Sequence, residues 1–157
     1  AQLPKAPFEE NLIDVDFLVR GGNAGSGNYK AYGGDAFVIL RGPSSLSFSE
    51  GSFTITSGDS GSQLYRGYGG EAGISTLIIS NTNVEFTDYF SIYIVGGVAG
   101  SSNKSVNTAY GGEATFRTVN SIVYMADTSY LTILGGSGGY YTLGSGGEAS
   151  FELLYSE

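Results

Sequence analysis

Short apolar runs alternate with glycine-rich polar segments along the whole chain. The runs at 15–19, 53–56, 90–95 and 130–134 are rich in β-branched and aromatic residues, and each leads into a glycine motif. Residues of these types suit the half-buried, pleated surface of a strand. No stretch of useful length shows a helical period. The pattern therefore predicts an all-β protein.

Two glycine motifs punctuate these runs four times. The first is Gly22-x-x-Gly25, repeated at Gly58, Gly97 and Gly136, in steps of 36, 39 and 39 residues. The second recurs in steps of 36, 42 and 35 residues, as Tyr32-Gly33-Gly34-Asp35-Ala36, Tyr68-Gly69-Gly70-Glu71-Ala72, Tyr110-Gly111-Gly112-Glu113-Ala114 and Ser145-Gly146-Gly147-Glu148-Ala149. Two motifs that recur together four times indicate a fourfold internal repeat.

Each repeat carries three predicted strands. A second strand follows each acidic residue, at 36–40, 72–79, 114–119 and 149–154, and a shorter third strand lies at 46–48, 84–86 and 122–124. One unit is too thin to bury its own apolar face, which favours a four-repeat β-solenoid, or parallel β-helix, about 20 Å tall. A β-prism or β-sandwich of Greek-key units is the alternative. We expect one domain at 17–157, preceded by an arm or cap at 1–16.

Composition excludes several classes of function. With 26 Gly but three Pro among 157 residues, the glycine serves turns and not a collagen helix or a proline-rich linker. The absence of Cys and His removes the usual zinc, haem, thiol and Ser-His chemistry. A net charge of −8 with seven scattered basic residues disfavours nucleic acid and anionic membranes. No apolar run reaches the length of a membrane span.

One stretch resembles a known repeat. It runs from Gly69-Gly70-Glu71-Ala72 through Phe86-Thr87-Asp88-Tyr89 to Gly96-Gly97. It is similar to the repeats of right-handed parallel β-helix surface proteins of the polymorphic outer membrane protein type, which pair Gly-Gly-Ala-Ile with a downstream Phe-x-x-Asn. Here Glu71 stands before Ala72, and Asp88-Tyr89 replaces the asparagine version. The resemblance implies an extracellular or cell-surface passenger or adhesin, with no catalytic residues to carry over. A chain that starts at Ala1 instead of Met also fits secretion.

Stacked coils would align the acidic residues of the second motif, Asp35, Glu71, Glu113 and Glu148, in a column. Like charges at strand spacing repel unless something compensates them, and Ca²⁺ held by carboxylate and carbonyl oxygens is one solution. The favoured interpretation needs no metal or cofactor: each carboxylate accepts N–H groups of a glycine turn. The motif is then a turn scaffold made of Gly33, Gly34, Asp35, Gly69, Gly70, Glu71, Gly111, Gly112, Glu113, Gly146, Gly147 and Glu148.

The same stacking predicts a tyrosine ladder. Tyr32, Tyr68 and Tyr110 precede the double glycine in three units, while Ser145 breaks the column in the fourth. Such a ladder is either an internal support or, if it is exposed, a platform for a sugar ring. No nucleophile elbow or phosphate loop is present, so we expect no enzyme.

The loops between the two motifs vary in length and sequence while their flanks repeat. The segments 23–30, 58–66, 98–108 and 137–143 all leave the same side of the predicted stack. Their Ser, Asn, Gly and Tyr content is typical of adaptable recognition loops. Any specificity for a partner would therefore lie here.

The ends of a solenoid expose strand edges unless they are capped. The apolar positions Phe151, Leu153 and Tyr155 continue almost to the last residue, and Phe8 and Leu12 are the apolar positions of the N-terminal arm. This pattern predicts head-to-tail association of copies of the chain.

Two functions follow from these predictions. The first is a structural subunit of an extracellular, self-assembling filament or matrix. The alternative is a cell-surface adhesin that binds a glycan or a host surface protein through the variable loops.

Overall fold

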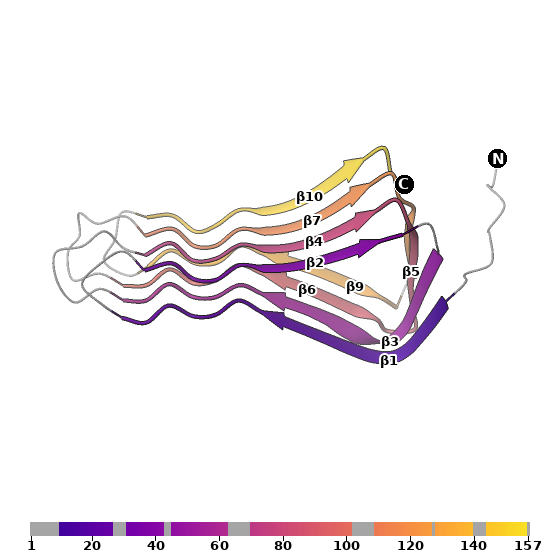
Figure 1. The fold of residues 1–157 in the computed structure, drawn as a ribbon, viewed down its shortest axis with the longest axis horizontal. Coiled ribbons are helices and arrows are strands. Elements are labelled where there is room, and N and C mark those ends of the chain that lie inside the picture. Colours follow the sequence, from indigo (N-terminus) through magenta and orange to yellow (C-terminus); the bar gives the residue numbers. More distant parts are fainter. Residues whose placement is uncertain are drawn as a thin grey trace.

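The chain folds as the predicted solenoid (Figure 1). The computed structural model describes residues 10–26, 31–42, 45–62, 70–101, 109–126, 128–139 and 144–156. About 54% of the described residues lie in strands, and parallel sheets stack in a β-solenoid of about three full turns, so that four coils contribute a strand to one sheet. Within the described ranges, no helix is long and apolar enough to cross a membrane.

Ten strands build the walls of the solenoid. In chain order they are β1 (Glu10–Arg20), β2 (Ala36–Arg41), β3 (Ser45–Thr56), β4 (Ser75–Ser80), β5 (Asn83–Thr87), β6 (Ser91–Val95), β7 (Ala114–Val119), β8 (Val123–Met125), β9 (Tyr130–Leu134) and β10 (Ala149–Leu154). One sheet has the order β8-β5-β3-β6-β9, with β1 also paired to β3, and the other has the order β10-β7-β4-β2.

Every strand pairs with its counterpart one coil away. All the pairs are parallel, and equivalent residues face each other, as Phe48 faces Phe86 and Ala114 faces Ala149. A β-prism or β-sandwich of Greek-key units is excluded, because its neighbouring strands run antiparallel. This register places side chains of one face in columns along the stack, so the core is built column by column.

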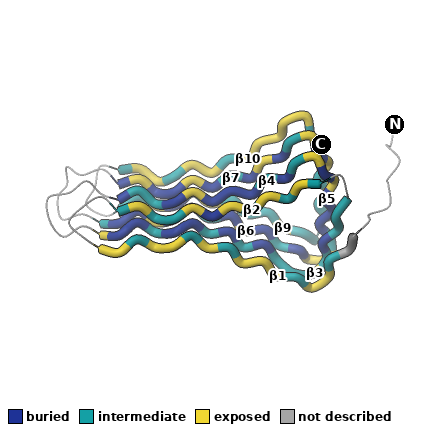
Figure 2. Tube along the Cα trace, in the orientation of Figure 1, coloured by how far each residue is buried: buried dark blue, intermediate teal, exposed yellow. Residues whose placement is uncertain are grey.

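The centre of the core is an aromatic cluster in the middle coils. Phe48, Phe53, Phe86 and Phe90 are each at most 1% exposed, and the centroids of neighbouring rings lie 4.9–5.9 Å apart. Burial of one such side chain contributes about 1.5–3 kcal/mol. Figure 2 shows how burial is distributed: the inner coils are buried, whereas the first and last coils are largely exposed.

The two longest strands, β1 and β3, bend at a corner, so that each contributes to two walls. β3 joins the runs at 46–48 and 53–56, which the sequence pattern presents as separate strands. Between them Glu50 has a φ of 52° and Gly51 a φ of 124°. A Cβ atom on Gly51 would also lie 2.4 Å from the carbonyl oxygen of Val15, so both the backbone conformation and the space require glycine here. The bend gives the strand-rich end of the solenoid a third wall, which contains β5 (Figure 1) and its pairing partner β8.

The segment 1–16, which the sequence predicts as an N-terminal arm or cap, is described from residue 10 onward. Residues 10–16 belong to β1, which pairs with β3 along its length, and Leu12 packs against the core. Phe8 lies outside the described residues. β4 departs from the predicted strand, because it begins at Ser75 and not at residue 72. This later start changes the alignment of the second glycine motif.

Candidate functional site

The glycine motifs form a flat arm that extends away from the three-walled end (Figure 1). The first motif stacks as its spacing predicts, in the columns Gly22–Gly58–Gly97–Gly136 and Gly25–Gly61–Gly100–Gly139. A Cβ atom on Gly58 would lie 2.1 Å from the carbonyl oxygen of Gly22, and one on Gly136 would lie 1.8 Å from that of Gly97. Gly51 is the only described glycine with a positive φ. The arm therefore requires glycine for close approach of backbones and not for an unusual conformation.

The two walls of the arm touch backbone to backbone. Gly34 N–H donates to the Gly22 oxygen at 2.8 Å, Gly58 N–H to the Gly34 oxygen at 2.7 Å, and Gly73 N–H to the Gly58 oxygen at 3.0 Å. The same zigzag continues in the later coils, where N–H groups of Gly112, Gly136 and Gly147 donate to oxygens of Gly97, Gly112 and Gly136. No side-chain layer separates the walls at these positions, so the arm is held by main-chain hydrogen bonds.

Hydrogen-bond directions in the arm repeat every three residues. Gly21 and Ala24 N–H groups donate to the next coil of their own wall, at Thr56 and Asp59, while the Gly22 oxygen accepts from the opposite wall. Asp59 N–H donates instead to the side-chain Oδ1 of Asn23 at 2.9 Å. Three residues per turn with no internal hydrogen bonds is the geometry of a polyproline II-type chain. It explains why the two glycines of the first motif are three positions apart.

Two buried serines link the first series of these glycine hydrogen bonds, which ends at Gly73, to the second series, which starts at Gly97. The Ser57 hydroxyl donates to the Gly73 oxygen at 2.5 Å and accepts from Gly97 N–H at 2.7 Å. The Ser75 hydroxyl accepts from Ser57 N–H and donates to the Val95 oxygen, each at 2.6 Å. Ser57 is 3% and Ser75 0% exposed, and these bonds satisfy backbone groups that burial would otherwise leave unpaired. The sequence signal for this role was the position of Ser57 directly before a motif glycine.

The acidic residues do not form the column that the sequence predicts. Ile74, and not Glu71, follows Asp35, because Ala36 N–H donates to the Ile74 oxygen and the stack then continues to Glu113. In the second unit the position that stacks on Gly34 belongs to Gly73, whose Cβ would lie 2.2 Å from the Gly34 oxygen, whereas Gly70 stacks on Ala31, with its Cβ 2.2 Å from the Ala31 oxygen. The motif there is three residues out of step with the stack. The fourth unit is in step: Ala114 N–H donates to the Glu148 oxygen.

One acidic side chain makes the bond that the turn interpretation expects. Asp35 Oδ1 accepts the N–H of Ile74, one coil away, at 2.8 Å. Among the described residues, no three acidic side chains gather where they could hold a metal ion. Gly33, Gly111 and Gly147 lie against backbone of the opposite wall or neighbouring coil, as scaffold glycines do, while Gly69 lies outside the described residues.

The tyrosine ladder is likewise interrupted. Tyr32 is bridged to Glu71, and Ala72 N–H donates to the Tyr110 oxygen, so Glu71 separates the two tyrosines along the stack. Tyr68 lies outside the described residues. Tyr32 is 59% and Tyr110 46% exposed, so neither is an internal support. Both stand on the arm as exposed aromatic rings.

The variable segments follow the first glycine motif in the sequence of each unit. Residues 27–30, 63–69, 102–108 and 140–143 lie outside the described residues. The arm extends to the end of the molecule opposite the three-walled body, and this end is called its tip (Figure 1).

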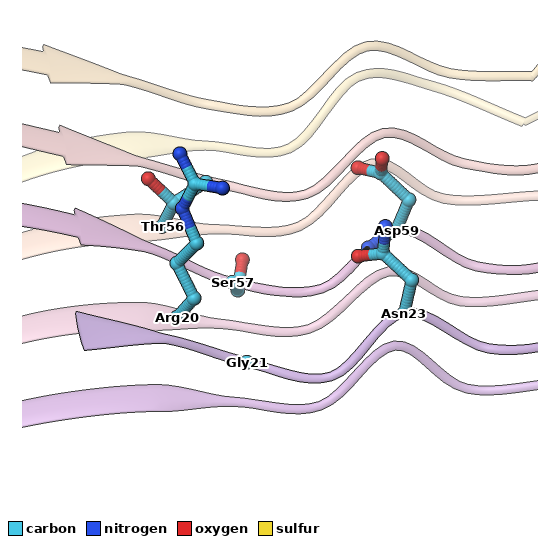
Figure 3. Close-up of a pocket in the computed structure, with 6 residues that line it drawn as sticks. All are labelled: Arg20, Gly21, Asn23, Thr56, Ser57 and Asp59. Atoms are coloured by element: carbon cyan, nitrogen blue, oxygen red, sulfur yellow. Dashed lines mark hydrogen bonds between the residues drawn. The ribbon is translucent and has the colours of Figure 1, made fainter. Parts of the chain in front are cut away.

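A polar hollow of about 360 Å³ lies on one face of the arm, in the first two coils. Figure 3 shows its two sides: Arg20 reaches up beside Thr56, and Asn23 lies below Asp59. Its base is formed by Gly21 and Ser57, which have little or no side chain. Asn23 and Asp59 each use a side-chain oxygen to accept a backbone N–H of the next coil. These two residues thus hold the arm together, and the hollow follows from the missing side chains between them.

No known protein family, no curated protein and no solved structure matches the chain.

Proposed function

We propose that the protein is a recognition module of an extracellular surface, which binds a polysaccharide carrying acidic groups through the tip of its glycine arm. The observation that carries the proposal is the arm itself. Its backbone hydrogen bonds hold the four coils of the arm together. In the sequence, one variable segment follows the first glycine motif of each coil. A rigid support lowers the entropy lost on binding and fixes the spacing of the contacts.

The composition of the four segments supports a glycan as the partner. Together, residues 27–30, 63–69, 102–108 and 140–143 contain five of the 12 tyrosines of the chain. Tyr32 and Tyr110 add two exposed rings on the adjacent arm. Aromatic faces pack against sugar rings, and tyrosine, serine and asparagine supply adaptable hydrogen bonds at a low entropic cost.

The charge of the segments supports an acidic partner. Lys30, Arg66 and Lys104 lie in them, which is three of the seven basic residues of the chain, and none of the 15 acidic residues does. The rest of the sequence carries all 15 acidic residues and only four basic ones, so these segments are the part of the chain best suited to an anionic polymer. Electrostatic attraction of this kind raises the association rate and weakens with salt.

The resemblance of the second repeat to surface proteins of the polymorphic outer membrane protein type supports the extracellular location. Association of copies into a filament uses other residues, at the two ends of the stack. Recognition at the tip and assembly at the ends can therefore occur in the same molecule.

A glycan array that includes acidic polysaccharides tests this function. We expect the full chain to bind acidic glycans, and a variant with Gly and Ser at 63–69 and 102–108, at unchanged length, to lose binding more than about tenfold with an unchanged Tm. Silence on the array, or equal binding by the variant, would overturn the proposal. Binding of the chain to surface proteins and not to glycans would replace the glycan with a protein partner.

A single aromatic ring provides a finer test. Replacement of Tyr110 by Ala removes an exposed ring beside the tip and should weaken glycan binding about three- to tenfold without loss of stability. Tyr124→Ala is the matched control, because Tyr124 is also exposed but lies on β8 in the three-walled body. Equal effects of the two changes on the dissociation constant would remove Tyr110 from the binding site.

A further inference from the structure

The two end coils expose side chains that the inner coils bury. Phe151 and Leu153 of β10 continue the inward columns of Phe116 and Thr118, yet they are 53% and 50% exposed. At the other end, Phe17 of β1 pairs with the fully buried Phe53 and is 43% exposed. Among the described strands, β10 pairs only with β7 and β2 only with β4. Both ends of the core are therefore open.

The first coil also carries two glycines that no described neighbour requires to be glycine. Gly22 and Gly25 begin the two glycine columns, and no described atom lies within 4 Å of a Cβ built on either. Neither has a positive φ. In the later coils, the Cβ of each column glycine would collide with the carbonyl oxygen of the preceding coil, at 1.8–2.2 Å. Glycine at the first coil is thus needed only if a further coil lies beneath it.

We infer that this further coil is the last coil of a second copy of the chain, stacked head to tail in the same register as the coils within one chain. The last coil of the second copy would place a glycine carbonyl against Gly22 and another against Gly25, because Gly136 and Gly139 end the same two columns there. A translation along the stack then suffices to join the two copies, since all the strands in each sheet are parallel.

The residues that would meet are compatible in size and charge. Continuing the register of the four-stranded sheet places Phe151 against Val38 and Leu153 against Leu40 of the second copy. These are apolar contacts of the kind that the inner coils already make. Glu152, which forms an ion pair with Arg117 at 3.5 Å, gains a second cation within diagonal reach in Arg41 of the second copy.

The interface contains one contact between like charges, of a kind that also occurs within a single chain. Asp35 of the second copy would follow Glu148, as Glu148 already follows Glu113 within one chain. The interface joins two different surfaces of the same chain, so it does not close on itself, and repetition gives a filament. This inference does not depend on recognition at the tip, because it uses only the end coils.

Sedimentation velocity of the full chain over a wide concentration range tests the inference. We expect assemblies that grow with concentration, and fibres with an axial repeat of about 19 Å per molecule, which is four coils at the spacing of strands. A chain that stays monomeric at all concentrations would overturn it.

Two variants identify the surfaces. Gly22→Ala adds a methyl group in open space within one chain, so the fold and Tm should be retained while assembly is lost. Leu153→Lys blocks the opposite end, and far-ultraviolet circular dichroism checks that it folds. Each variant alone should be monomeric, and an equimolar mixture should form one-to-one dimers and nothing longer, because each partner keeps one free end. Tyr124→Ala should assemble like the unmodified chain. Assembly of Gly22→Ala at the unmodified level would contradict the inference.

Discussion

At the scale of single residues, the fold depends on which glycines face backbone and which face open space. The four glycines of one column share a motif and a sign of φ, yet a Cβ atom would meet a carbonyl oxygen in three of them and nothing described in the fourth. Glycine costs stability in an extended segment unless the missing side chain is needed. The same residue type thus has different consequences at different levels of the stack.

Replacement of Gly58 and Gly22 by Ala should separate these cases. Gly58→Ala places a Cβ 2.1 Å from the Gly22 oxygen, where backbone must move, and should lower the free energy of unfolding by more than about 3 kcal/mol. Gly22→Ala should leave it unchanged or raise it by up to about 1 kcal/mol. Chemical denaturation of the two variants at low protein concentration, where copies do not associate, measures both effects. Equal losses would mean that the arm is not packed in this way.

Removal of a buried hydroxyl from the core should raise the free energy of unfolding, in contrast to Gly58→Ala. Thr118 is 0% exposed, and its Oγ1 is the one buried side-chain polar atom of the described residues without a hydrogen-bond partner. It lies between Ile79 and Leu153 in an apolar column. Thr118→Val keeps the shape and removes the unpaired group, so the free energy of unfolding should rise by about 1 kcal/mol. Thr54→Val, on the outer face of the pleat of β3, is the control and should change little.

At the scale of elements, parallel strands and a three-residue hydrogen-bond period share one stack. The strands alternate buried and exposed residues, as in the pattern of β7, whereas the arm directs successive residues to its own wall, the opposite wall and solvent. The change of period occurs where the apolar run ends and the glycine motif begins. Serines 57 and 75 lie at this boundary and bond to both walls.

Loss of the Ser57 hydroxyl should therefore be costly. Ser57→Ala leaves the buried Gly97 N–H and Gly73 oxygen without their partner, which should lower the free energy of unfolding by about 1–3 kcal/mol. Ser52 is a suitable control, because its hydroxyl donates to Asp16 at 2.7 Å in an exposed position. Ser52→Ala should cost a few tenths of a kcal/mol. A similar effect of the two changes on the denaturation midpoint would argue against a bridging role for Ser57.

Much of this architecture is encoded locally and could be predicted. The alternating β-branched and aromatic runs specify the strands, and the spacing of the first glycine motif gives the correct stacking partners. The second motif gave a wrong alignment, because Gly70-Glu71-Ala72 copies its neighbours in sequence while Gly73, three residues later, lies against Gly34 and Gly70 lies against Ala31. Only contacts between coils decide which residue each of two nearby glycines stacks on. The acidic column and the tyrosine ladder failed for this single reason.

At the scale of the whole molecule, different regions have different structural roles. The three-walled body carries the aromatic core, the arm is built on glycine backbones, and the two end coils expose apolar side chains. In a stacked repeat, stability is a sum of contacts between neighbouring coils. An exposed end coil is therefore the weakest part of an isolated chain, and stacking of copies would stabilise both ends.

The central claim is that glycine backbones build a rigid arm, and amide hydrogen exchange tests it most directly. Glycine-rich segments without structure exchange at once, whereas N–H groups in stable hydrogen bonds exchange only on opening. The account predicts that the amides of Gly58, Gly112 and Gly136, which donate across the arm at 2.7–2.8 Å, are protected to the same degree as those of the core strands. Exchange of these three amides at the rate of an unstructured peptide, with the strands still protected, would contradict it.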